Sequence, residues 1–212
     1  MKFSKKDLLL YAVTDRSWSE TSSLEEQVQK AIDGGITFLQ LREKNIEISE
    51  FLKLGKQLRK LTNKYQIPYV INDDIDVAVQ VQADGIHIGQ DDCDIDKCRE
   101  LLGESKIIGV SVQTVEQAIL AQEEGADYLG VGAIFTTNTK LDASKVSLDL
   151  LKEICMSVSI PVVAIGGITT TNIEKLAGTG INGVAVVSEI FSSDNIVEST
   201  KKLLNITKKF IL

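Results

Sequence analysis

The sequence predicts a protein of the α/β class that folds as a single-domain (β/α)8 barrel, the TIM barrel, over residues 1–212. About eight short apolar runs rich in β-branched residues alternate with about eight longer stretches of helical period. The runs are apolar along nearly their whole length, as strands of a parallel sheet covered on both faces require. A length of 212 residues suits one such barrel. A doubly wound open sheet is the alternative, but no G-x-G-x-x-G follows the first run.

The expected strands follow one another at regular spacing. They are residues 8–15, 36–43, 68–73, 85–89, 106–112, 126–135, 161–167 and 183–189. Between them, stretches such as 23–35, 48–66 and 114–125 have the helical period expected of the barrel's outer layer. Active sites of TIM barrels lie in the loops at the C-terminal ends of the strands. The polar residues that follow each run are therefore expected to face one shared basin.

The composition excludes several classes of function. A formal net charge of -7 and a pI near 4.9 argue against binding to nucleic acid or to anionic membranes. No apolar stretch approaches the roughly 18 residues that a membrane-spanning helix needs, and the N-terminus lacks the cleavage pattern of a signal peptide. The three cysteines, Cys93, Cys98 and Cys155, are expected to be reduced, packed thiols. We therefore expect a soluble cytoplasmic protein.

Acidic residues gather at the ends of two neighbouring strands. Asp73 ends the third run and Asp92 follows the fourth, while Arg42 lies at the end of the second run and Lys44 and Lys140 follow the second and sixth. Simple salt bridges are one reading of this set. The excess of acid favours another, in which the two carboxylates form part of the oxygen shell of Mg²⁺, and the cations bind phosphate oxygens. The sequence thus indicates a site for Mg²⁺ and a diphosphate.

The opposite side of the expected basin has a different composition. Gly166 and Gly167 end the seventh run, and Ser188 lies near the end of the eighth. Loops after strands seven and eight frequently bind phosphate in TIM barrels, although these glycines could serve turn geometry alone. His87, the only histidine, lies inside a strand run and is expected to be packed and hydrogen-bonded rather than catalytic. Two further acids, Asp74 and Asp91, are expected to begin helices.

An ordered set of motifs extends over nearly the whole chain. It consists of YAVTD, QLREK, NDD, ADGIHIGQDD, IGVSVQT, GADYLGVGAIF, PVVAIGGI and GVAVVSEI, between about Tyr11 and Ile190. Together these motifs resemble the thiamine phosphate synthase family. The resemblance implies a transferase that couples hydroxymethylpyrimidine diphosphate to thiazole phosphate, with thiamine phosphate and pyrophosphate as products. It implies small-molecule substrates and Mg²⁺ as cofactor, and says nothing of oligomeric state.

The resemblance also implies roles for individual residues. The residues implied for the pyrimidine diphosphate site are Gln40, Leu41, Arg42, Glu43, Lys44, Asn72, Ser111 and Lys140, of which Arg42, Lys44 and Lys140 would be catalytic. Those implied for the thiazole phosphate site are Thr137, Asn138, Thr139, Gly167, Val187 and Ser188. Asp73 and Asp92 would hold Mg²⁺. The sequence departs from the family at Thr136, where the family usually has proline, which is expected to loosen this loop by up to about 1 kcal/mol.

The chemistry that follows from these parts needs no protein base. A dissociative route, in which pyrophosphate leaves before the thiazole nitrogen attacks, is our hypothesis for the mechanism. Three alternatives remain. One is a thiazole tautomerase-like relative, which should not need the full set of cations and acids. The second is a barrel that binds thiamine precursors without catalysis, and the third is an unrelated phosphate-binding barrel, which leaves the paired acids unexplained.

Overall fold

The eight strands form a closed, all-parallel barrel in sequence order, with β8 paired to β1. The computed structural model describes residues 3–18, 22–137 and 145–211. The strands are β1 (Leu10–Val13), β2 (Phe38–Leu41), β3 (Tyr69–Asn72), β4 (Gly85–Ile88), β5 (Ile107–Val112), β6 (Tyr128–Val131), β7 (Val162–Ile165) and β8 (Gly183–Val186). The predicted TIM barrel is thereby confirmed, and the open-sheet alternative is excluded.

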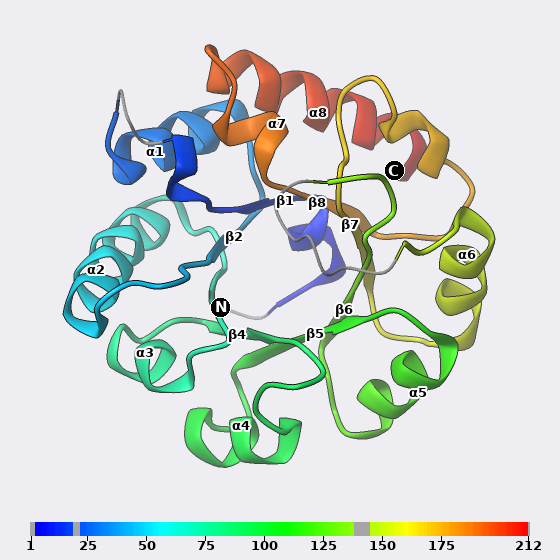
Figure 1. Cartoon of the computed structure of the whole chain (residues 1–212), viewed down its shortest axis with the longest axis horizontal. Coiled ribbons are helices and arrows are strands. Elements are labelled where there is room, and N and C mark those ends of the chain that lie inside the picture. The colour runs from blue at the N-terminus through cyan, green and yellow to red at the C-terminus, as the bar shows by residue number, and fades with distance from the viewer. Residues whose placement is uncertain (1–2, 19–21, 138–144, 212) are drawn as a thin grey trace.

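Helices surround the barrel on its outside (Figure 1). The α-helices are α1 (Leu24–Gly34), α2 (Ile48–Tyr65), α3 (Ile75–Gln80), α4 (Ile95–Leu102), α5 (Val115–Glu123), α6 (Leu148–Ser157), α7 (Ser188–Phe191) and α8 (Ile196–Ile211). Short 3₁₀ helices are η1 (Lys5–Leu8), η2 (Arg16–Trp18) and η3 (Ile173–Leu176). The connection from β7 to β8 contains only η3, so the strict strand–helix alternation is interrupted there. Among the described residues, none of the helices is both long and apolar enough to cross a membrane.

Alternate strand residues face two separate apolar layers. On β2, Leu39 and Leu41 belong to the layer between the sheet and the helices, whereas Phe38 packs inside the barrel. On β1, Tyr11 and Val13 also point inward. Burial on both faces explains why the strand runs are almost continuously apolar. It also places Gln40, which lies between two outward-facing leucines, on the inner side near the C-terminal end of β2.

Four polar side chains cap strand starts at the N-terminal end of the barrel. Each stands immediately before an even-numbered strand and accepts a hydrogen bond from a backbone N–H near the start of the preceding strand. The four bonds are Leu10 N to Thr37 Oγ1 (2.9 Å), Tyr69 N to Asp84 Oδ2 (2.9 Å), Ile108 N to Asp127 Oδ2 (2.8 Å) and Val162 N to Asn182 Oδ1 (3.0 Å). These bonds give hydrogen-bond partners to buried backbone N–H groups at the N-terminal ends of the strands, opposite the C-terminal face.

The N-terminal segment from Phe3 to Leu8 closes the same end of the barrel. The segment containing η1 lies across the centre of the ring of strands in the view along the barrel (Figure 1). Leu8 is fully buried in the inner apolar layer, and the Phe3 ring packs 6.1 Å from Phe38 and 6.0 Å from Tyr128. With this end closed by apolar side chains, a ligand reaches the interior from the C-terminal end of the strands.

Candidate active site

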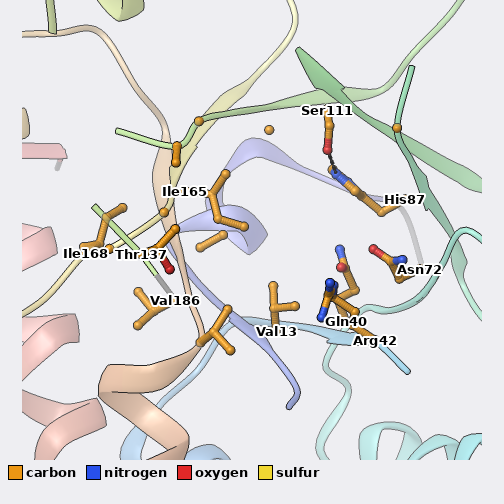
Figure 2. Close-up of a pocket in the computed structure, with 18 of the residues that line it drawn as sticks. Val13, Gln40, Arg42, Asn72, His87, Ser111, Thr137, Ile165, Ile168 and Val186 are labelled. Carbon is orange, nitrogen blue, oxygen red and sulfur yellow. Dashed lines mark hydrogen bonds between the residues drawn. The ribbon is translucent and has the colours of Figure 1, made fainter. Parts of the chain in front are cut away.

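A cavity of about 410 Å³ lies at the C-terminal ends of the strands. Figure 2 shows side chains from several different strands and loops pointing toward it. The residues that line it are Val13, Gln40, Arg42, Asn72, His87, Gly89, Gln90, Asp91, Ser111, Gln113, Gly130, Gly132, Ala133, Thr137, Ile165, Gly166, Gly167, Ile168, Ala185, Val186, Val187 and Ser188. The volume lies within the range of small-molecule sites, and the shared basin expected from the strand ends is present.

Most of the predicted site residues that the structure describes line this cavity. They are Gln40, Arg42, Asn72, Ser111, Thr137, Gly167, Val187 and Ser188. Lys44, Asp73 and Asp92 do not line it and instead lie in the loops that follow β2, β3 and β4. The predicted residues Asn138, Thr139 and Lys140 lie outside the described part of the chain.

The segment after β2 divides its side chains between the cavity and the protein interior. Leu41 is fully buried in the outer apolar layer, so its side chain does not reach the cavity. The backbone N–H of Arg42 donates to Thr14 Oγ1 at 3.0 Å, which ties this segment to β1. Glu43 is buried and pairs with Arg16 at 2.6 Å, while its Oε1 has no hydrogen-bond partner. Burial raises the pKa of the Glu43 carboxyl above its usual range, and the Arg16 guanidinium opposes this shift.

The two predicted metal ligands form an acidic pair with one lysine beside them. Lys44 Nζ lies 2.8 Å from Asp73 Oδ2. Asp92 Oδ2 accepts a hydrogen bond from the Gly89 backbone N–H at 2.6 Å. Partial burial raises the pKa of the Asp92 carboxyl, and the nearby Asp73 carboxylate raises it further. Asp73 itself has a φ of 63°, an unfavourable conformation for a non-glycine residue that is often found at functional sites.

This donor set fits a divalent cation that prefers oxygen ligands. Asp73 and Asp92 are close enough to interact, and a bound cation would remove their mutual repulsion. No group of three or more His, Cys, Asp or Glu side chains suitable for a metal occurs within residues 3–18, 22–137 and 145–211. Mg²⁺ commonly retains water ligands and binds substrate oxygens, and these would complete the shell begun by Asp73 and Asp92.

One of the two acids expected to begin helices does so, and the other does not. Asp74 caps α3, and its Oδ1 accepts from the Val77 backbone N–H at 2.9 Å. The prediction for Asp91 was wrong, because α4 begins after Asp94 and Asp91 lines the cavity. Sequence alone does not distinguish the two cases, since the turn after β4 is longer than the turn after β3.

The loop after β7 approaches the loop after β6 too closely for any side chain larger than hydrogen. A Cβ on Gly167 would lie 2.3 Å from the Thr136 carbonyl oxygen, and Gly167 has a φ of 62°. Asn172 Nδ2 donates to the Gly167 carbonyl at 2.8 Å. On the same side, Glu189 Oε1 accepts from the Thr170 N–H at 2.9 Å and from its hydroxyl at 2.8 Å. These contacts join the β7 and β8 loops beside Val187 and Ser188.

His87 is packed and hydrogen-bonded, as predicted, but it also reaches the cavity wall. Its Nε2 lies 2.9 Å from Ser111 Oγ, the contact drawn as a dashed line in Figure 2. Its Nδ1 lies 2.9 Å from the Tyr128 hydroxyl inside the barrel. Gln90 and Gln113 also line the cavity, and sequence reasoning assigned them no role. Their positions directly after β4 and β5 are the signal that marks them as candidates.

The barrel and its C-terminal cavity place the chain among TIM barrels built to hold a small polar ligand. Residues 10–190 match the sequence model of the family described as thiamine monophosphate synthase, and the chain belongs to this family. It is 50% identical over 203 residues to the thiamine-phosphate synthase of Ruminiclostridium cellulolyticum, covering 96% of this chain and 97% of that protein. It is 48% identical over 197 residues to the thiamine-phosphate synthase of Clostridium tetani, with coverage of 93% and 94%.

A solved structure supports the same relationship. The thiamine phosphate pyrophosphorylase of Pyrococcus furiosus superimposes with a TM-score of 0.91 at 38% sequence identity. The alignment covers 98% of this chain and 99% of that chain. The resemblance read from the sequence motifs is therefore confirmed at the level of the family.

Proposed function

We propose that this chain couples hydroxymethylpyrimidine diphosphate to thiazole phosphate and releases thiamine phosphate and pyrophosphate. Membership of the thiamine monophosphate synthase family supports this transferase activity. So do relatives of nearly equal length that carry the name thiamine-phosphate synthase. The reaction would take place in the cavity at the C-terminal face. A cytoplasmic location and a single TIM-barrel domain over residues 1–212 belong to the same proposal.

The single observation that carries the proposal is the meeting of cations and carboxylates after three consecutive strands. Arg42 lines the cavity, and Lys44 lies against Asp73 at 2.8 Å. Asp92, which interacts with Asp73, completes this set. A diphosphate bound with Mg²⁺ satisfies both signs of charge at once, whereas a monophosphate would leave the acids unpaired. Within this proposal Asp73 and Asp92 hold Mg²⁺, and Arg42, Lys44 and Lys140 contact the diphosphate.

The two substrates would occupy opposite sides of the cavity. Gln40, Arg42 and Lys44, with Asn72 and Ser111, would hold the pyrimidine diphosphate, whereas Leu41 and Glu43, whose side chains are buried away from the cavity, would contribute only their backbone. Residues 137–139, with Gly167, Val187 and Ser188, would hold the thiazole phosphate, because the loops after strands seven and eight of TIM barrels frequently bind phosphate and Gly167, Val187 and Ser188 line the cavity there. This arrangement would bring the pyrimidine methylene and the thiazole nitrogen together near the middle of the cavity.

The chain's residues would act by positioning and by electrostatics. When bound, Mg²⁺ would stabilise negative charge on the leaving pyrophosphate. Arg42 and Lys44 would hold the diphosphate as the bond between the methylene carbon and oxygen breaks, with both electrons leaving on pyrophosphate. The lone pair of the thiazole nitrogen then forms the new carbon–nitrogen bond. That nitrogen carries no proton, so no general base is needed, in agreement with a hydrogen-bonded role for His87.

The competing functions lack support of the same kind. A tautomerase-like relative needs an acid–base pair and has no use for the acids at Asp73 and Asp92. A non-catalytic binding barrel would hold both substrates without forming product. Formation of thiamine phosphate distinguishes the proposed transfer from both alternatives, because neither would make this product.

The test is formation of thiamine phosphate from the two substrates and Mg²⁺, with and without EDTA. Asp92→Ala is the test variant. Asp96→Ala is the matched control, because Asp96 is an exposed acid in the first turn of α4. We expect metal-dependent product that falls at least about a hundredfold in Asp92→Ala and stays unchanged in Asp96→Ala. Binding of both substrates without any product would overturn the proposed transfer, and product that survives EDTA would overturn the metal site.

A further inference from the structure

A chain of five polar side chains crosses the barrel beneath the cavity. Gln40 Nε2 donates to the Tyr11 hydroxyl, and the Tyr11 and Tyr128 hydroxyls lie 2.9 Å apart. The Tyr128 hydroxyl lies 2.9 Å from His87 Nδ1, and His87 Nε2 lies 2.9 Å from Ser111 Oγ. Gln40 and Ser111 line the cavity from β2 and β5. Two cavity residues on different walls are thus joined by hydrogen bonds that run through the barrel interior.

Two glycines in the barrel leave space for these hydrogen-bonded side chains. A Cβ on Gly109 would lie 2.1 Å from the Tyr128 ring, and a Cβ on Gly130 would lie 3.1 Å from His87 Cε1. The Phe38 ring packs against both tyrosines, at 4.6 Å from Tyr11 and 5.7 Å from Tyr128. Close packing of this kind restricts the rotamers of the polar side chains and holds their hydrogen bonds in register.

Each tyrosine in the chain has one hydrogen to donate. Burial raises the pKa of both the Tyr11 and Tyr128 hydroxyls well above the ordinary tyrosine value, so both stay neutral. Because Gln40 Nε2 donates to Tyr11, the Tyr11 hydrogen is available for Tyr128. Tyr128 then donates to His87 Nδ1, which must accept. His87 therefore carries its hydrogen on Nε2 and donates to Ser111 Oγ.

The opposite direction of donation satisfies fewer groups. With Gln40 Nε2 facing the Tyr11 hydroxyl, as in the structure, donation from Tyr128 to Tyr11 would bring hydrogens from both Gln40 and Tyr128 to the Tyr11 oxygen. The Tyr11 hydrogen would then have no acceptor among the hydrogen bonds of the described residues, although this side chain is fully buried. A buried donor without a partner destabilises the folded state. Donation from Gln40 toward Ser111 is therefore the favoured direction.

We propose that Tyr11, Tyr128 and His87 are positioning residues that fix Ser111 as a hydrogen-bond donor to the ligand. With its oxygen accepting from His87, the Ser111 hydroxyl directs its own hydrogen into the cavity. The ligand atom it meets must then be an acceptor, such as a ring nitrogen or a phosphate oxygen. Only the identity of that ligand, the pyrimidine diphosphate, rests on the proposed function.

The first test measures directly which ring nitrogen of His87 carries the hydrogen. The chain contains one histidine, so ¹⁵N-histidine labelling of the untagged protein gives a single imidazole in the NMR spectrum. We expect a neutral ring at pH 7.5, with the hydrogen on Nε2 and none on Nδ1. A hydrogen on Nδ1, or on both nitrogens, would overturn the proposed direction of donation. This readout does not require turnover, so it stands apart from failure of the proposed transferase activity.

The second test removes the hydroxyl that donates to the histidine. Tyr128→Phe should reduce the population of the Nε2–H tautomer and raise the KM for pyrimidine diphosphate about three- to tenfold, as loss of one oriented hydrogen bond predicts. The KM for thiazole phosphate should not change. Tyr69→Phe is the matched control. Tyr69 is also a fully buried tyrosine, but its hydroxyl contacts the Gly55 carbonyl at 3.3 Å and takes no part in the hydrogen bonds between Gln40 and Ser111. Equal changes in both variants, or in both KM values, would indicate a structural role only.

A third comparison remains informative if Tyr128→Phe fails to fold. His87→Gln can keep an N–H donor near the Nε2 position, whereas His87→Ala removes it. We expect His87→Gln to retain a KM for pyrimidine diphosphate at least about threefold lower than His87→Ala. Identical kinetics in the two variants, at equal thermal stability, would refute the role assigned to His87.

Discussion

Lys44 Nζ lies 2.8 Å from Asp73 Oδ2, in an ion pair that joins the loop after β2 to the loop after β3. The lysine side chain is 55% exposed, so water screens most of the attraction within this pair. One ammonium also balances only one of the two acids, Asp73 and Asp92. The pair is therefore better suited to receiving a charged ligand than to stabilising the fold.

Substitution of Lys44 should separate these two roles. We expect Lys44→Met to change the free energy of unfolding by less than about 1 kcal/mol, because the ion pair is exposed. The KM for pyrimidine diphosphate should rise at least about tenfold, because a charge-assisted contact to phosphate is lost. Lys201→Met is the control, since Lys201 pairs with Glu198 on the surface of α8 at 3.5 Å. A large loss of stability with an unchanged KM would assign Lys44 to the fold instead.

A second prediction concerns the close approach of the Thr136 carbonyl to Gly167. Gly167→Ala should destabilise the protein by about 2 kcal/mol or more, because a Cβ would lie 2.3 Å from the Thr136 carbonyl and the φ of 62° is unfavourable for alanine. The KM for thiazole phosphate should rise more than the KM for pyrimidine diphosphate. The Michaelis constants and the thermal midpoint measure the two effects.

Gly178→Ala is the matched control for backbone strain. Gly178 has a φ of 78°, but nothing lies within 4 Å of the position where its Cβ would stand. It should lose only about 1–2 kcal/mol, from strain alone, with both KM values unchanged. Equal behaviour of the two alanine variants would show that the contact with Thr136 is unimportant.

The strand ends were predictable because they depend on local sequence. Apolar runs buried on both faces specify the strands, and the residues that follow them, such as Asn72 and Asp73, must then lie at the C-terminal face. Gln40 was expected at the site, together with Leu41, from the family resemblance, and strand alternation then turns only Gln40 toward the cavity. In each case a single element fixes the position of the side chain.

The row of hydrogen-bonded side chains from Gln40 to Ser111 could not be predicted, because it depends on contacts between strands that are distant in the sequence. Tyr11 and Tyr128 are 117 residues apart, and both read as ordinary apolar strand residues. The position of Asp91 depends instead on the conformation of the turn between β4 and α4, which contains one glycine, Gly89, and no proline. Packing between strands places Tyr11 and Tyr128, and turn geometry places Asp91. Neither can be deduced from the neighbouring residues in the sequence.

A third prediction concerns the cysteines. Burial raises the pKa of the Cys98 thiol to about 12 and that of Cys155 to about 11. At pH 8 their thiolate fractions are then about one in ten thousand and one in a thousand, and the thiolate is the reactive form. A thiol reagent should therefore label Cys93 first, with the other two reacting only on unfolding. Cys93→Ser is the control and should abolish the early labelling, whereas early labelling of Cys98 in the native protein would contradict the prediction.

The last prediction tests the caps at the N-terminal end of the barrel. Asp84 accepts two hydrogen bonds from Arg59, at 2.7 and 3.0 Å, and one from the Tyr69 backbone N–H at 2.9 Å. The two Arg59 N–H groups and the Tyr69 backbone N–H all lose their acceptor in Asp84→Ala. Because the ion pair is only about one-fifth exposed, the loss should reach about 2 kcal/mol, or about 5 °C in the thermal midpoint.

The kinetic constants of Asp84→Ala should stay unchanged, since the C-terminal cavity lies at the opposite end of the strands. Glu198→Ala removes an exposed acid from a surface ion pair and should alter stability by less than about 0.5 kcal/mol. Asp127→Ala should resemble Asp84→Ala, because Asp127 makes the equivalent bond to the Ile108 N–H and pairs with Arg99 at 2.6 Å. A rise in either KM in the two aspartate variants would mean that the N-terminal caps also position the cavity, because a change at one end of the barrel would then be transmitted along the strands.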